Sequence, residues 1–258
     1  MPIKVLPPDL AAKIAAGEVV ERPASVVKEL VENSIDAGSS QITVEIKDGG
    51  VEQIKVIDDG HGIPAEEVAT AFQRHATSKI DSQDQLDAIA TLGFRGEALP
   101  SIAAVSRTVI TTRQPLNTAG YRLDLLWGEQ ESSGAQGCPP GTSIEVSDLF
   151  GNLPARRKFL RSSSAETSRI QELVSRYALV FPGIRFQLMV DGRISFTSPG
   201  NGLPREALLA VYGPQAATAM LEIQEDNPET GYQVDGFVSA PSLSRANRSY
   251  MTFFVNRR

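Results

Sequence analysis

Three polar residues, Glu29, Asn33 and Asp36, recur at the spacing that places side chains on one face of an α-helix. The opposite stripe of that helix carries Val27, Leu30, Val31, Ser34 and Ile35. Such a helix can pack on a core and direct two carboxylates and an amide at one place. An acid that activates water and an amide oxygen that ligates Mg²⁺ are what phosphoryl hydrolysis needs. Taken alone, the stretch fits an ordinary solvent-exposed face of an amphipathic helix better than it fits a site.

A second acidic motif, Asp58-Asp59-Gly60-His61-Gly62, follows the alternating apolar residues of a predicted strand. Its two glycines permit backbone torsions and close approaches that a side chain would prevent. A carboxylate at the end of a strand, above such a loop, can accept a hydrogen bond from an exocyclic amine. A simple turn explains the same residues.

The segment Gly93-Phe94-Arg95-Gly96-Glu97-Ala98-Leu99 is a glycine-flanked loop that runs into a predicted helix. Free backbone N–H groups at a helix start form an anion site, and Arg95 supplies a counter-charge. Phosphate is the natural ligand of such a site. Neither the Gly-x-x-x-x-Gly-Lys-Ser/Thr loop nor the Gly-x-Gly-x-x-Gly pattern occurs in the chain, which disfavours the usual nucleotide folds.

Other polar residues fit the same pocket more weakly. Thr77, Ser78 and Lys79 offer two hydroxyls and a cation suited to phosphates, and Thr142 opens a strand after a long loop. We interpret both histidines, at positions 61 and 75, as non-catalytic. No second histidine or cysteine stands at metal-ligand spacing from either of them.

The net charge of −6 conceals an asymmetry between the two parts of the 258-residue chain. Residues 1–150 contain 12 Lys/Arg and 22 Asp/Glu, a net charge of −10, whereas residues 151–258 contain 13 and 9, a net charge of +4. The basic part can contact nucleic acid through Arg156, Arg157, Lys158, Arg161, Arg245, Arg248, Arg257 and Arg258. Solvated surface charge is the alternative interpretation.

Cys138 is the single cysteine, which excludes a disulfide framework and a thiolate metal cluster and agrees with a reducing compartment. No run of about 18 apolar residues suggests a membrane span, and the first residues do not resemble a secretory signal. We therefore expect a cytoplasmic protein without a membrane partner.

The hydrophobic pattern predicts helices packed against one face of a largely antiparallel sheet, an α+β fold. Pro23 and Gly38 bound the main helix, and shorter helices are expected at 9–15, after Pro64, around 86–90 and after Glu97. The predicted strands are Gln41–Lys47, 54–57, 108–113, 120–127 and 142–149, with a loop at 128–141. A helical region at 154–179 and a hairpin around Asp191-Gly192 follow.

Residues 201–204 are typical of a linker, and they divide the chain into 1–200 and 201–258. The second unit is predicted to contain a helix at 205–212 and strands at 220–223, 232–239 and 250–255. A unit of about 55 residues without a closing element is marginal by surface-to-volume arguments. We therefore expect the chain to be a fragment of a longer protein.

Several segments, in the same order along the chain, resemble the motifs of the MutL proteins of DNA mismatch repair. They are 13–19, 27–38, 58–62, 76–79, 93–99 and 148–159. The resemblance spans essentially the whole chain, and the block at 93–99 is very specific to this family. MutL proteins belong to the GHKL superfamily of ATPases, together with gyrase-type topoisomerases, a major chaperone and histidine kinases.

The resemblance implies a GHKL (Bergerat-type) α/β sandwich with a mostly antiparallel sheet in residues 1–200, including an N-terminal dimerisation arm at 1–20. Residues 201–258 would begin a truncated ribosomal-S5-domain-2-like α/β domain. The cofactors implied are ATP and Mg²⁺. Glu29 would be the general base, Asn33 the Mg²⁺ ligand and Asp58 the adenine reader. The other implied nucleotide-binding residues are Gly62, Thr77, Lys79, Gly93, Phe94, Arg95, Gly96, Glu97, Ala98, Leu99 and Thr142.

The resemblance also implies partners. They are a second copy of the chain, joined in an ATP-dependent N-terminal dimer, the mismatch-recognition protein MutS, a downstream nuclease and a helicase. DNA would bind weakly and without sequence specificity through the basic part, near the nucleoid. The alternatives are a DNA-binding scaffold with a vestigial nucleotide pocket, and another GHKL ATPase.

Three features depart from the family pattern. Asp59 stands where the family often has Asn, and Gly151 where an aromatic residue is common. The family also has a lysine that reaches the γ-phosphate from the second domain, beyond the position corresponding to residue 258. Without that cation the charge of the transition state is less well neutralised, so we expect weak hydrolysis by this chain.

Overall fold

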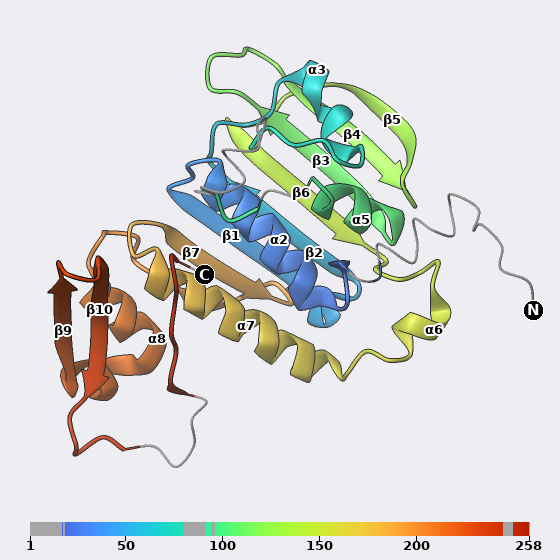
Figure 1. Ribbon diagram of the computed structural model, residues 1–258. Coiled ribbons are helices and arrows are strands. Elements are labelled where there is room, and N and C mark those ends of the chain that lie inside the picture. Colours follow the sequence, from blue (N-terminus) through green and yellow to red (C-terminus); the bar gives the residue numbers. More distant parts are fainter. Residues whose placement is uncertain (1–16, 18, 80–90, 94–95, 245–249, 258) are drawn as a thin grey trace, which may run out of the picture.

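A large twisted sheet forms the centre of the molecule (Figure 1). The computed structural model describes residues 17, 19–79, 91–93, 96–244 and 250–257. The sheet has eight strands in the order β5-β4-β3-β6-β2-β1-β7-β8. Their bounds are β1 Gln41–Lys47, β2 Gln53–Asp58, β3 Arg107–Arg113, β4 Gly120–Leu126, β5 Glu129–Gln136, β6 Gly141–Ser147, β7 Arg185–Val190 and β8 Arg193–Thr197. β1 and β7 pair in parallel and the other neighbours are antiparallel, which confirms the predicted sheet.

Three helices cover one face of this sheet (Figure 1). They are α2 (Pro23–Asp36), α5 (Ala98–Ala104) and α7 (Ser163–Val180). The shorter helical segments are η1 (Asp48–Gly50), α3 (Ala65–Val68), η2 (Thr70–Phe72) and α6 (Pro154–Arg157). In the part of the chain that the structure describes, no helix is both long enough and apolar enough to cross a bilayer. The helices expected at 9–15 and 86–90 lie outside the described residues.

Helix α2 follows the sequence prediction closely. Pro23 occupies its first turn, where a missing N–H costs nothing, and Gly38 just beyond its end has a positive φ of 71°. Val27, Leu30 and Val31 are buried against the sheet. The polar face carrying the candidate site residues is therefore held in place by the burial of the opposite stripe.

The hairpin of β1 and β2 is positioned by its alternating pattern. Ile42, Val44 and Ile46 of β1 are buried, and the antiparallel register pairs Ile42 with Asp58. Asp58 is thus the last residue of β2, a strand in the interior of the sheet, and the glycine-containing turn begins directly after it. The apolar residues of the hairpin belong to the same core cluster as those of α2.

Two sequence predictions in this domain are wrong. The segment 128–141, expected to be a loop, contains the strand β5, whose residues are nearly all exposed. The helical region at 154–179 is interrupted, because α6 ends at Arg157 and α7 begins at Ser163. Ser162 starts the second helix by accepting a hydrogen bond from the backbone N–H of Ala165.

Residues beyond the predicted linker form α8 (Pro204–Thr218), β9 (Met220–Asn227) and β10 (Tyr232–Ser239). β9 and β10 pair as a separate antiparallel sheet. Helix α8 is kinked at Gly213, whose φ is 80°, immediately before Pro214. The strand expected at 250–255 is wrong, since the described residues 250–257 belong to neither sheet.

Candidate active site

The polar face of α2 presents the three residues singled out from the sequence. Glu29 is a quarter exposed and its carboxylate lies 3.2 Å from Lys28 Nζ. Asn33 is half-buried one helical turn further along, and the side chain of Asp36 is only 7% exposed. Residues four apart on a helix are neighbours, so Glu29 and Asn33 open onto the same side of α2.

Lys79 joins this face from a distant part of the chain. Its Nζ donates hydrogen bonds to Asn33 Oδ1 at 2.9 Å and to Asp36 Oδ2 at 2.6 Å. The backbone N–H of Lys79 also donates to Thr77 Oγ1 at 3.1 Å. The predicted cation therefore contacts the predicted metal ligand directly, and Thr77 is held beside it.

Asp36 also holds the start of the glycine-flanked loop. The backbone N–H groups of Leu92 and Gly93 donate to its two carboxylate oxygens at 2.9 and 3.1 Å. The sequence pattern placed Asp36 on the correct face of the helix but assigned it no role. Its function as an anchor depends on contacts with residues more than 50 positions away, which helical periodicity does not reveal.

Asp58 forms the centre of a second cluster beneath α2. Its carboxylate accepts hydrogen bonds from Ser34 Oγ at 2.8 Å, from Gly60 N at 2.9 Å and from Thr142 N at 3.3 Å. Burial raises the pKa of Asp58 above its usual value, because desolvation outweighs these hydrogen bonds. Ser34 directly follows Asn33, so this cluster and the polar face of α2 are joined through one residue.

Glycines allow the backbone to close around Asp58. Gly141 has a φ of 109°, and a Cβ there would overlap the carbonyl group of Asp58. Gly62 has a φ of 68°, and a Cβ there would overlap the carbonyl group of Arg113. Between them, the buried hydroxyl of Thr112 contacts Thr142 Oγ1 at 3.0 Å and accepts from the backbone N–H of residue 63.

The segment 93–99, in which an anion site was predicted, begins beside the polar face of α2. A Cβ on Gly93 would lie 3.3 Å from Lys79 Nζ and 3.7 Å from Asn33 Oδ1. Gly96 has a φ of 61° and accepts a hydrogen bond from His75 N, and Glu97 precedes the first turn of α5. Ala98 begins that helix and Leu99 packs against the core. Phe94 and Arg95 lie outside the described residues.

The two histidines take no part in these clusters. His61 Nδ1 lies 2.7 Å from the carbonyl oxygen of Gly62, and His75 Nδ1 lies 3.8 Å from Glu97 Oε1. Within the described ranges, no group of three or more His, Cys, Asp or Glu could hold a metal ion. A metal at Asn33 would therefore take its further oxygen ligands from water or from a substrate, since Mg²⁺ usually keeps several waters and also binds phosphates.

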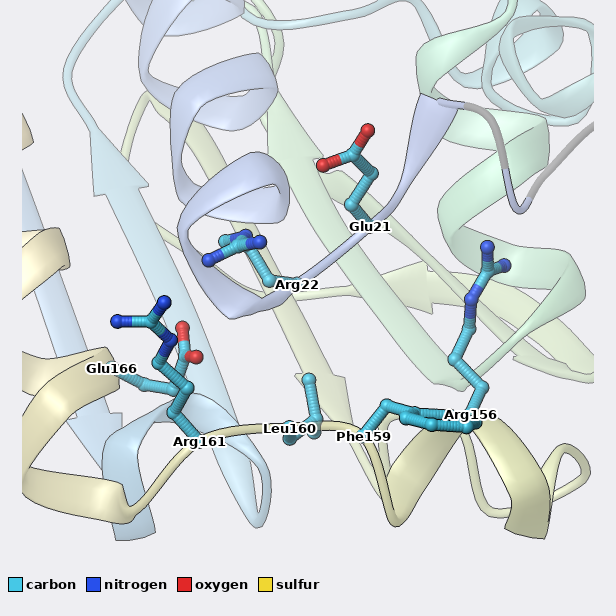
Figure 2. Close-up of a pocket in the computed structure, with 7 residues that line it drawn as sticks. All are labelled: Glu21, Arg22, Arg156, Phe159, Leu160, Arg161 and Glu166. Atoms are coloured by element: carbon cyan, nitrogen blue, oxygen red, sulfur yellow. The ribbon is translucent and has the colours of Figure 1, made fainter.

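A cleft of about 380 Å³ lies at the other end of α2 and does not include any residue of the predicted nucleotide site (Figure 2). It is lined by Glu21, Arg22, Arg156, Phe159, Leu160, Arg161 and Glu166. The predicted site residues Asn33, Lys79 and Gly93 instead meet near the C-terminal end of α2, where they are partly buried. This place gathers the oxygens of Asn33 and Asp36, the ammonium of Lys79 and a glycine backbone around one helix.

The chain matches two protein families. Residues 21–150 match the family described as histidine kinase-, DNA gyrase B- and HSP90-like ATPase. Residues 208–258 match the family described as DNA mismatch repair protein, C-terminal domain. The ATPase match contains Glu29, Asn33 and Asp58, and the second match begins within α8.

Curated relatives and solved structures agree with these matches. The DNA mismatch repair protein MutL of Desulforamulus reducens is 50% identical over 99% of the chain and 40% of the relative. The DNA mismatch repair protein MutL of Pelotomaculum thermopropionicum is 52% identical over 96% of the chain and 41% of the relative. The Aquifex aeolicus MutL ATPase domain complexed with ADP has a TM-score of 0.64 at 31% identity, covering 81% of this chain and 74% of that one. The chain spans about two fifths of the length of these curated relatives.

Proposed function

Since the chain belongs to the MutL family of DNA mismatch repair proteins and has the GHKL ATPase fold, we propose that it binds ATP with Mg²⁺ and hydrolyses the nucleotide. We propose further that it forms the N-terminal, nucleotide-switched part of a longer protein that coordinates mismatch repair. The observation that carries the proposal is that Asn33, Lys79 and Gly93 converge. Asp58 is linked to the same helix, because it accepts a hydrogen bond from Ser34, the residue that follows Asn33.

The residues of the site fit a magnesium nucleotide. Asn33 Oδ1 and the oxygens of Asp36 are hard donors, and the missing side chain of Gly93 leaves the backbone accessible beside them. When bound, Mg²⁺ would neutralise phosphate charge. Asn33 would hold the metal, and Glu29, one turn earlier, would take a proton from the attacking water.

Asp58 would recognise the adenine ring. Its carboxylate has about four lone-pair sites, and Ser34, Gly60 and Thr142 donate to it within the protein. Its remaining capacity suits a hydrogen bond from an exocyclic amine. Thr142 would border the same end of the pocket, because its backbone N–H donates to Asp58. Gly62 would lie nearby, since the backbone N–H of the next residue donates to Thr112 Oγ1, which contacts Thr142 Oγ1.

The phosphates would contact the loop before α5. Among its described members, Gly93 lies beside Lys79 and Gly96 lies against the backbone of Ala76, while Glu97, Ala98 and Leu99 lead into α5. We propose that Phe94 and Arg95, which lie outside the described residues, also belong to this cradle, together with Thr77 and Lys79. Backbone N–H groups and a lysine together suit a polyanionic group.

The activity is tested by comparing Glu29→Gln with Glu66→Gln, an exposed carboxylate on α3. We expect calorimetry to detect binding of a non-hydrolysable ATP analogue by the unchanged chain and by both variants. Turnover should fall about 100-fold or more in Glu29→Gln alone, because a general base contributes about 10²–10⁴ in rate. Unchanged turnover in Glu29→Gln would favour the scaffold with a vestigial pocket.

The partners of the longer protein are part of the same proposal. We propose a second copy of the chain, joined when ATP binds, together with MutS, a downstream nuclease and a helicase in the cytoplasm. Sedimentation with and without the ATP analogue tests the dimer. We expect a larger species only with the analogue, and an identical profile in both conditions would contradict this part.

DNA would bind weakly through the basic part of the chain. Arg157 is paired with Asp148 at 2.9 Å and Arg156 with the carbonyl oxygen of Gly17, so Lys158 and Arg161 are the better candidates for phosphate contacts. We expect the affinity for duplex DNA to fall steeply between about 50 and about 200 mM salt, whatever the sequence, as it does for other phosphate-contacting proteins. An affinity that does not change with salt would refute this contact.

A further inference from the structure

The ammonium group of Lys79 occupies the place where two oxygens of α2 converge, 2.9 Å from Asn33 Oδ1 and 2.6 Å from Asp36 Oδ2. We propose that Lys79 acts as an internal counter-ion at this position, and that it must leave before Mg²⁺ can bind Asn33. The inference rests on the proposed function, which supplies Asn33 as the metal ligand. It adds a competitor for the metal that belongs to the chain itself.

Burial explains why the lysine is held there. The side chain of Asp36 is 7% exposed and that of Lys79 is 20% exposed. A carboxylate so far removed from water needs a counter-charge or several hydrogen bonds. Asp36 has both, because Leu92 N and Gly93 N donate to it beside the ammonium. The lysine thus neutralises the charge at the end of α2 when no metal is present.

The same position cannot hold the lysine and a metal ion together. Mg²⁺ binds oxygen ligands at about 2.0–2.1 Å, and a metal on Asn33 Oδ1 would face an ammonium that contacts the same atom. Two cations within a few ångströms repel strongly at a partly buried site.

The exchange has a consequence for the rest of the site. Lys79 N is hydrogen-bonded to Thr77 Oγ1, so the lysine that would leave Asn33 stands beside a second proposed phosphate ligand. Asp36 retains its bonds to Leu92 N and Gly93 N and can then contribute an oxygen near the metal. Metal entry and release of Lys79 toward the phosphates would thus be one coupled step.

The test measures metal binding without nucleotide, using Mn²⁺ as the probe and electron paramagnetic resonance to count free ions. The variants are Lys79→Met, Lys79→Gln and Lys79→Arg, with Lys55→Met as the matched control. Lys55 also pairs with a carboxylate, Glu145, at 3.7 Å, but lies on β2. Thermal melts accompany each variant, and the two neutral replacements keep the test valid if one of them misfolds.

We expect the neutral variants of Lys79 to bind Mn²⁺ at least about tenfold more tightly than the unchanged chain, since a competing charge is gone. Lys79→Arg and Lys55→Met should bind it as weakly as the unchanged chain does. Equal affinity in all proteins would overturn the inference, as would an equal gain in the Lys55 variant or in Lys79→Arg. Failure to bind the ATP analogue would reject the proposed function instead, and is measured separately by calorimetry.

Discussion

Replacing Asp58 by Asn tests the adenine end of the site. The amide is nearly isosteric and keeps one oxygen that can accept from Gly60 N and Thr142 N. Its new NH₂ group would face Ser34 Oγ, which can rotate to accept, because that hydroxyl also has the carbonyl oxygen of Leu30 as a partner for its proton. We therefore expect the asparagine side chain to be accommodated at this position without loss of the fold.

Nucleotide binding should nevertheless weaken markedly. A hydrogen bond to a charged group is worth about 1.5–3 kcal/mol, which corresponds to a dissociation constant about 10- to 150-fold higher. The NH₂ group of the asparagine is a donor, so it does not pair with the exocyclic amine of adenine. The ratio of GDP affinity to ADP affinity should therefore be higher in the variant than in the unchanged chain. The preference for adenine over guanine should therefore shrink.

Calorimetry with ADP and GDP measures both effects, and Asp59→Asn is the control. Asp59 is the adjacent carboxylate, but it is exposed and accepts from the backbone N–H groups of Ser40 and Gln41, outside the site. Unchanged ADP affinity in Asp58→Asn would refute the assignment of Asp58. An equal loss in both variants would show that the effect is not specific to the pocket.

Three further predictions concern stability and backbone geometry. Although desolvation opposes them, hydrogen bonds lower the pKa of Asp59, so its carboxylate stabilises the fold above the unfolded pKa of about 3.8. The destabilisation by Asp59→Asn, at most about 1 kcal/mol for so exposed a group, should vanish in urea titrations as the pH falls through the lowered pKa. Tyr177→Phe removes the 2.7 Å hydrogen bond from Tyr177 OH to the buried Glu32. Urea titrations should show a loss of about 1–3 kcal/mol, and no loss would contradict the importance of this contact. Gly141→Ala should weaken ADP binding at least about tenfold, because φ is positive there and the Cβ overlaps the carbonyl of the acidic turn. Gly134→Ala, where the structure leaves open space, should not, and equal calorimetric titrations for the two would refute the argument.

The elements that position the site could be predicted from the sequence because each has one buried face. Strand β1 matches its predicted bounds, Gln41–Lys47, since buried and partly exposed residues alternate along it. Helix α2 matches from Pro23 to within two residues of Gly38. β5 was missed because it is an edge strand exposed along nearly its whole length, so no apolar alternation marks it.

The network around the site could be predicted only in part. Helical periodicity placed Asn33 and Asp36 on one face, and the glycines marked the loops. The bonds from Lys79, Leu92 and Gly93 to Asp36 join segments far apart in the chain, and no local pattern encodes them. The expected strand at 250–255 shows the converse error, since an apolar run does not form a strand without a neighbouring strand to pair with.

The most direct test of the account is a crystal structure of the chain with an ATP analogue and Mg²⁺. We predict that the exocyclic amine of the base contacts Asp58, that the metal contacts Asn33 Oδ1, and that Lys79 Nζ has left both Asn33 and Asp36. A nucleotide bound elsewhere, for example in the cleft between Arg22 and Arg161 at the start of α2 (Figure 2), would contradict the account.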